Sequence, residues 1–374
     1  ENLSSITNGE KVPSYEASDK KYIQIYDAIY INFALEKGKY EEALNLFLRD
    51  IHLIEDLKLF TRMSVISMKA NRIKDTSIIV NRWLELSPNS VIAHNLGISA
   101  SLEEGDLMKA RLIFNNYLDL IDENDKSYYS RLINVLSENR NRANVVKFFD
   151  KYLAKNENRL LTVSFIELLR FYSQHTKALE YIEKIGTQNE RTLIRFKASS
   201  LSSINRNKEA IDLLRNYLQT KKNVDRLFQF ELITLHLLVK DVTAAEQVIS
   251  NILEIDPENH ELVFQIGALC YNAGSFDLAE KYFSYLLSMN LMLSDANYFL
   301  GLVDYNNGNY DEAIRHFERA TNGDRKFQAQ IRKASSIRKK SGLTDAILFL
   351  EDLKAQYKSN LLKINILLGE INLY

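Results

Sequence analysis

The sequence predicts an all-α, right-handed solenoid of about ten helix-turn-helix repeats, followed by one unpaired C-terminal helix. The main observation is a small residue that returns about every 34 positions, a period typical of helical-hairpin repeats. These ladder residues are Ala43, Thr76, Ala110, Asn144, Ala178, Ala210, Ala245, Ala279, Ala313 and Ala346. Composition agrees, because three prolines and twelve glycines in 374 residues leave little room for a turn-rich β fold.

Other residues recur in phase with the ladder. A large apolar residue follows each ladder residue by four positions: Phe47, Val80, Phe114, Phe148, Ile182, Leu214, Ile249, Phe283, Phe317 and Leu350. A glycine precedes it by five positions in four repeats: Gly38, Gly105, Gly274 and Gly308. We interpret the small residue as the point where two antiparallel helices approach, and the glycine as the left-handed residue that ends the first helix.

Two consecutive units, residues 261–290 and 295–322, resemble the tetratricopeptide (TPR) repeat. Gly267 and Gly301 match the small residue of its first helix, as Ala279 and Ala313 match that of its second. The resemblance covers roughly residues 21–354. It implies stacked helical hairpins whose first helices line a concave wall.

Prolines mark two of the repeat junctions. Pro88 in LELSPNS and Pro257 in LEIDPEN match the proline that closes a TPR unit. Ser90 and Asn259 follow them and are expected to cap the next helix.

The repeats differ in quality along the chain. Residues 126–190 are degenerate, because the turns hold Asn139 and Ser173 instead of glycine and Asn144 replaces the ladder alanine. A bend between two straighter halves is expected there. The predicted organisation is a flexible polar lead at 1–20, N-terminal repeats at 21–125, degenerate repeats at 126–190, C-terminal repeats at 191–354, and a capping helix or the first helix of a truncated repeat at 355–374.

Motifs for catalysis are not found. The six histidines fall in different repeats, no H-E-x-x-H is present, and the one cysteine, Cys270, fits a small core residue. No glycine-rich phosphate-binding motif follows a strand. The sequence therefore predicts a non-enzymatic protein without metal or cofactor.

The concave wall of the C-terminal repeats is the predicted binding surface. Its inner positions would present aromatic side chains from three adjacent repeats: Phe230, Phe264, Tyr271, Tyr298 and Tyr305. Such residues suit an extended peptide or a partner helix. The alternative is that they contact one another between repeats and stabilise the stack.

A basic patch follows the aromatic positions. Arg332, Arg338 and Lys339 lie in IRKASSIRKK and could receive an acidic segment or a C-terminal carboxylate of a partner. The alternative is a solvated helix face. Nucleic acid is disfavoured because the formal net charge is −1. The lysine and asparagine of the TPR carboxylate clamp are absent, since those inner positions hold, for example, Tyr298 and Phe299.

The first three repeats resemble a group of Gram-negative TPR lipoproteins. The resemblance rests on IYDAIYINFALEKGKYEEALNLFLRDI and VNRWLELSPNSVIAHNLGISASLEEGDLMKARLIF, about 100 residues. It implies an exported adaptor that presents cell-wall hydrolases to a periplasmic carboxy-terminal-processing protease. The expected location is the periplasm, with an outer-membrane lipid tether whose cysteine this chain does not carry. The alternatives are a cytoplasmic scaffold, an assembly factor for a pilus or polysaccharide exporter, and the regulatory region of a larger enzyme.

Overall fold

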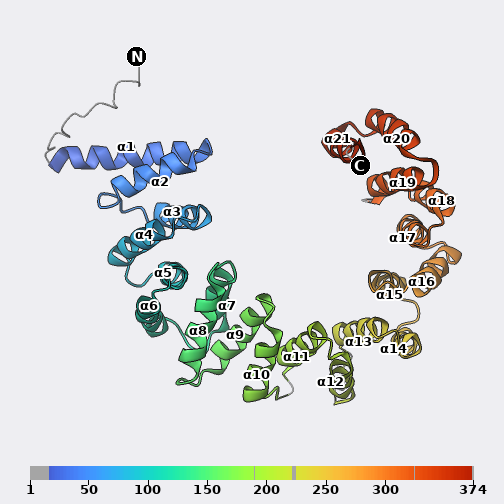
Figure 1. Ribbon diagram of the computed structural model, residues 1–374, viewed down its shortest axis with the longest axis horizontal. Coiled ribbons are helices and arrows are strands. Elements are labelled where there is room, and N and C mark those ends of the chain that lie inside the picture. Colours follow the sequence, from blue (N-terminus) through green and yellow to red (C-terminus); the bar gives the residue numbers. More distant parts are fainter. Residues whose placement is uncertain (1–16, 189, 221–224, 324, 373–374) are drawn as a thin grey trace. The chain divides into compact units, whose positions relative to one another are not determined.

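The computed structural model describes residues 17–188, 190–220, 225–323 and 325–372 (Figure 1). These residues form α-helices and one short 3₁₀ helix, and they include no strand. The helices are α1 Ala17–Glu36, α2 Tyr40–Arg49, α3 Leu57–Lys69, α4 Ile73–Leu86, α5 Val91–Glu104, α6 Leu107–Leu120, α7 Lys126–Ser137, α8 Arg142–Leu153, α9 Arg159–Phe171, α10 His175–Ile185, α11 Arg191–Ser203, α12 Asn207–Thr220, α13 Arg226–Leu238, α14 Val242–Ile255, α15 His260–Asn272, α16 Phe276–Ser288, α17 Leu293–Asn306, α18 Tyr310–Arg319, α19 Arg325–Ser341, α20 Leu343–Gln356, η1 Lys358–Asn360 and α21 Leu361–Asn372.

The predicted all-α repeat solenoid is confirmed. Helices α1 to α20 follow one another as pairs joined by short turns, and α21 comes after the last pair. The ladder register is confirmed by burial: every ladder residue except the half-buried Asn144 is fully buried. All ten large apolar residues four positions later are buried as well. The period in the sequence is therefore the period of the core.

The turns inside the hairpins have the expected left-handed backbone. Gly105, for example, has φ of 86° and ends α5. In some repeats without this glycine a polar residue adopts the same conformation, as in Asn71 and Asn205, with φ of 60° and 63°. Asparagine is one of the few residues that tolerate this region, so these repeats keep the turn without glycine. The predicted caps Ser90 and Asn259 are confirmed, because each side chain accepts a hydrogen bond from a backbone N–H three residues later.

The two ends of the chain refine the expected boundaries. Helix α1 begins at Ala17, so residues 17–20 of the predicted flexible lead are helical, and residues 1–16 lie outside the described part. At the C-terminal end, α21 buries Ile364 and Leu368 in one cluster with Leu350 and Leu353 of α20. The last helix thus covers the apolar side of the hairpin before it.

The chain divides into two compact units, residues 1–196 and 197–374. The first unit contains two hydrophobic clusters, centred on Phe47 and Phe60 and on Phe114 and Phe149. The second contains a cluster around Phe283 and the smaller cluster at α19, α20 and α21. The boundary falls within α11, a few residues after the end of the predicted degenerate segment. The bend itself stays a prediction.

In the first degenerate repeat, asparagine side chains around the α7–α8 turn form hydrogen bonds to α5. The amide of Asn139, 1% exposed, donates to the backbone oxygen of Ser99 at 2.8 Å and lies 3.0 Å from its hydroxyl. Asn144 donates to the oxygen of Leu102 at 3.1 Å, and Asn141 to that of Glu103 at 3.5 Å. The carbonyls of Leu102 and Glu103 belong to the last turn of α5, where helical acceptors lack their usual partners, whereas Ser99 lies about one turn earlier in the helix. Asn139 and Asn144 therefore depart from the repeat pattern because they bind the C-terminal half of α5.

Replacing Asn139 by alanine is expected to lower the free energy of unfolding by about 1–2 kcal/mol, because a buried carbonyl and hydroxyl lose their partner. Urea unfolding followed by circular dichroism measures this. Replacing the exposed Asn124 by alanine is the matched control and is expected to change little. Equal stability of the two variants would contradict the assignment of Asn139.

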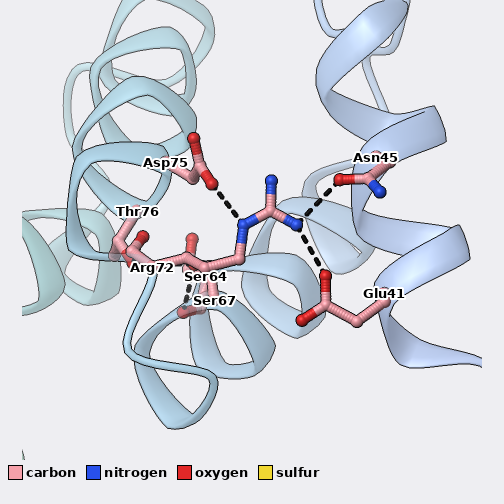
Figure 2. Close-up of polar contacts among 7 residues, drawn as sticks. All are labelled: Glu41, Asn45, Ser64, Ser67, Arg72, Asp75 and Thr76. Carbon is pink, nitrogen blue, oxygen red and sulfur yellow. Dashed lines mark hydrogen bonds and ion pairs between the residues drawn. The ribbon is translucent and has the colours of Figure 1, made fainter.

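An arginine joins the first two hairpins. Figure 2 shows Arg72, just before α4, reaching across to α2. Its Nη1 donates to Glu41 at 2.9 Å and to Asn45 at 2.7 Å, while its Nε donates to Asp75 at 2.5 Å. Burial, the largest single effect, lowers the pKa of Arg72. Hydrogen bonds and charge attraction from Asp75 and Glu41 together outweigh it, so the pKa is raised above its ordinary value. The guanidinium, with its fixed fork of donors, suits such a set of acceptors.

The same view explains why threonine replaces alanine in the second repeat (Figure 2). The hydroxyl of Thr76 lies 2.7 Å from that of Ser67, and Ser67 donates to the backbone oxygen of Ser64 at 2.9 Å. Both hydroxyl-bearing residues are fully buried. Because the hydroxyls of Thr76 and Ser67 are partners of one another, the polar ladder residue Thr76 is accommodated without leaving its own hydroxyl unsatisfied.

Candidate functional site

The five predicted wall aromatics lie on three first helices of the second unit: α13, α15 and α17. Tyr298 is buried, and Phe230, Phe264, Tyr271 and Tyr305 are partly buried. None of the five is fully exposed.

Rings contact one another between neighbouring hairpins. Phe264 and Tyr271 of α15 approach Phe299 of α17 with ring centroids 5.5 Å and 5.7 Å apart. Edge-on contacts at these distances stabilise packing. The geometry therefore supports the alternative in which aromatics hold the stack, while their contact with a partner stays a prediction.

An arginine lies over these rings. Arg325, the first residue of α19, has its guanidinium carbon 4.7 Å from the centroid of Phe299 and 5.1 Å from that of Tyr298. Its Nε donates to Asp295 at 2.7 Å. Cation–π contact and an ion pair together attach the start of α19 to α17. The orientation of α19, which carries the basic patch, follows from this attachment.

The basic patch divides into paired and unpaired cations. On α19, Lys333 pairs with Glu318 at 2.8 Å, and Lys340 pairs with Asp311. The three predicted residues Arg332, Arg338 and Lys339 form no ion pair within the described part of the chain. Arg332 and Lys339 are exposed and Arg338 is partly buried.

A cavity of about 630 Å³ brings one predicted aromatic and one predicted cation together. We call it the α19 groove. Helix α17 contributes Tyr298, α19 contributes Phe327, Gln328, Ile331, Arg332 and Ser335, and α21 contributes Lys363 and Ile366. Phe230, Phe264, Tyr271, Tyr305, Arg338 and Lys339 do not line it. The groove therefore combines an apolar wall with two cations and two neutral polar groups.

Sequence reasoning missed most of this lining. Residues 328, 331, 332 and 335 follow the i, i+3, i+4, i+7 spacing of one helix face, which is a readable signal. Lys363 and Ile366 share a face of α21, three residues apart. These two residues line the groove with α19 because α21 packs against α20. The sequence predicted an unpaired C-terminal helix but not where that helix would pack.

A second cavity, of about 290 Å³, lies among α16, α17 and α18 and is acidic. Glu280, Asp304, Glu312 and His316 line it. His316 Nε2 is 3.7 Å from Asp304 Oδ2, and burial lowers the pKa of His316. Burial also raises the pKa of Asp304 to about 6. These groups form a partly buried polar cluster, and no described atom points to a ligand in it.

The raised pKa of Asp304 has a consequence for stability. Because its pKa is higher in the folded than in the unfolded chain, the cost of its buried charge is absent at low pH and appears as the pH rises through about 6. Replacing Asp304 by asparagine is expected to raise the free energy of unfolding at pH 8 by on the order of 1 kcal/mol, and to change it little below about pH 4. Urea unfolding at both pH values measures the difference. If asparagine raised the free energy of unfolding equally at both pH values, the raised pKa of Asp304 would be contradicted.

Other kinds of site find no support among the described residues. They include no group of three or more His, Cys, Asp or Glu side chains that could hold a metal ion. Within the same residues, no helix combines the length and apolar character needed to cross a membrane. Cys270 is fully buried, and burial raises the pKa of its thiol to about 12, as for a core residue.

Comparison with family models finds one match, which covers part of the second unit. Residues 267–336 match the family model described as tetratricopeptide repeat. The match supports TPR repeats in this segment. It spans α16, α17 and α18 with parts of α15 and α19, and therefore includes Tyr298 and Arg332 of the groove. A search of curated proteins finds no match.

Comparison with solved structures finds similarity at low sequence identity, for example to the following three. The crystal structure of yeast Tom70 is 16% identical, with 94% of this chain and 90% of that chain covered, at a TM-score of 0.39. The TPR domain of P58(IPK) is 13% identical, with 94% and 99% covered, at 0.26. The pentatricopeptide repeat protein PPR10 from maize is 12% identical, with 92% and 49% covered, at 0.48.

Proposed function

We propose that this protein is a non-enzymatic scaffold that binds other proteins through its repeats. The observation that carries the proposal is the α19 groove, which lies partly on a segment that matches the TPR repeat. Repeats of this kind offer extended surfaces for partners. A groove with aromatic, aliphatic and cationic walls has the residue types that protein interfaces favour.

A narrower role follows from the resemblance of the first three repeats. We infer an exported bacterial adaptor, located in the periplasm and tethered to the outer membrane by a lipid outside this chain. It would hold a carboxy-terminal-processing protease and its cell-wall hydrolase substrates together. Holding both raises the effective concentration of one for the other and accelerates cleavage without any new chemistry.

The test is a reconstitution with purified components from the source organism. The full chain is added to the processing protease and a cell-wall hydrolase, and the rate of hydrolase cleavage is followed. Acceleration with an optimum at intermediate chain concentration is expected, because excess scaffold separates the two partners onto different molecules. Absence of acceleration, with no affinity of the chain for either protein, would exclude the adaptor role.

The general scaffold is tested separately. The immobilised chain is incubated with a periplasmic extract of the source organism, and bound proteins are identified against a bead-only control. At least one saturable, stoichiometric partner is expected. If none is retained from either a periplasmic or a cytoplasmic extract, the scaffold function is wrong.

A further inference from the structure

We infer that the α19 groove binds an acidic, apolar-containing peptide segment of a partner protein. The inference rests on the proposed scaffold function and names the chemistry of its ligand. Carboxylates of the segment would face Arg332 and Lys363, and an apolar side chain would lie against Phe327, Ile331 and Ile366.

Charge is the first argument. Arg332 and Lys363 both line the groove, and its described lining contains no acidic side chain. Neither cation forms an ion pair or a side-chain hydrogen bond in the described part of the chain. Arg325, at the start of the same helix, is by contrast held by Asp295 at 2.7 Å. The positive charge of the groove is therefore left for an external anion, and arginine suits a carboxylate because it can donate two parallel hydrogen bonds.

The apolar wall is the second argument. Ile366 is 51% exposed although it faces the groove, while Phe327 and Ile331 are partly buried against the cluster at α19, α20 and α21. A partner's apolar side chain placed here would remove the remaining surface of Ile366 from water. A simple anion would use the two cations and leave this wall uncovered. The combination favours a peptide with both carboxylates and an apolar side chain.

Size and shape agree with a short segment. A cavity of about 630 Å³ accommodates a few residues and is too small for a folded domain. Gln328 and Ser335 supply neutral donors and acceptors along the same helix face, which a peptide backbone can use. The partner is therefore recognised through a short stretch of chain, with Arg332 and Lys363 selecting its charge.

The test measures fluorescence anisotropy with the full chain and a labelled synthetic peptide in which two aspartates flank a leucine-phenylalanine pair. Arg332→Glu and Lys363→Glu are each expected to weaken binding about tenfold or more, because a charge-assisted contact becomes repulsive. The matched control is Lys339→Glu, which makes the same charge change on α19 outside the groove and is expected to alter affinity less than about twofold. Thermal melts confirm that all three variants fold.

A second pair of variants isolates the apolar contact. Ile366→Ser is expected to weaken binding about fivefold or more, whereas Leu362→Ser, at a position 74% exposed on the same helix and outside the groove, is expected to have no effect. A peptide with asparagine in place of aspartate is expected to bind more weakly, and higher salt to weaken the acidic peptide.

Several outcomes would overturn the inference. They are no binding of the acidic peptide, equal binding by the groove variants and Lys339→Glu, or equal affinity for a single-stranded oligonucleotide of the same charge. Sedimentation that shows a dimer abolished by Ile366→Ser would instead assign the groove to a second copy of this chain. These results remove the groove as support for the scaffold function but do not exclude that function, because a partner can bind the repeats elsewhere. The scaffold function itself fails if the extract experiment retains no partner.

Discussion

Replacing Phe317 by alanine is expected to lower the free energy of unfolding of the second unit by about 3–5 kcal/mol. Phe317 is fully buried on α18, four residues after the ladder residue Ala313. Its ring lies against Tyr298, with centroids 6.0 Å apart, and against the backbone of Gly301. Truncation would leave a cavity in the centre of the best-formed hairpin, which the rigid backbones around it cannot close.

Urea unfolding followed by far-ultraviolet circular dichroism measures this loss. Phe171→Ala is the matched control, because Phe171 is 58% exposed on α9 and its truncation removes little buried surface. The control is expected to cost less than about 1 kcal/mol. If the two variants were equally stable, Phe317 would not be a core residue of the hairpin.

Replacing Gly301 by leucine is expected to cost about 3 kcal/mol, because it overpacks the same contact. A Cβ atom at this position would lie only 2.7 Å and 2.8 Å from two ring carbons of Phe317. The ring is fully buried and cannot move aside. Glycine is therefore needed here for close approach of α17 and α18, not for a special backbone angle.

Gly369→Leu is the control for this prediction. A Cβ at Gly369 would meet no atom within 4 Å, so leucine there is expected to raise stability by up to about 1 kcal/mol through helix propensity. Opposite signs at the two glycines are expected in the same unfolding experiment. In addition, Gly301→Leu should cost less when Phe317 is already alanine, since the two changes share one space. Additive effects would contradict direct contact.

The fold was predictable because its periodic signal is the core itself. The ladder residues and the large residues four positions later are the side chains that meet between paired helices, so reading them gives the register of each hairpin. The ends of the helices were harder to predict. Helix α1 begins at Ala17, inside a polar stretch without an apolar period that would predict its start.

Departures from the repeat had physical reasons that one sequence does not display. Asn144 and Asn139 were interpreted as signs of a degenerate repeat, but Asn139 donates to the carbonyl of Ser99 and Asn144 to that of Leu102, both on α5. These bonds join residues about forty positions apart. No local sequence pattern predicts a hydrogen bond between residues so far apart in the chain.

The candidate site was predictable only in part, because it depends on how three helices meet. Tyr298 and Arg332 were chosen for the correct chemistry, and both line the groove. Phe264 and Tyr271 occupy equivalent inner positions, yet their rings pack on Phe299 of the next hairpin. Helical position determines which way a side chain leaves its helix, and the neighbouring repeat determines whether it remains accessible.

Site-specific photo-crosslinking in the source organism tests the central claim, that the α19 groove contacts a partner protein. A benzophenone amino acid is placed at Ile366, in the groove, or at Leu348, which is 61% exposed on α20 and outside it. The account predicts a discrete adduct with another protein from position 366, lost when Arg332 is changed to glutamate, and none from position 348. Adducts that are equal at both positions, or that are unaffected by Arg332→Glu, would contradict it.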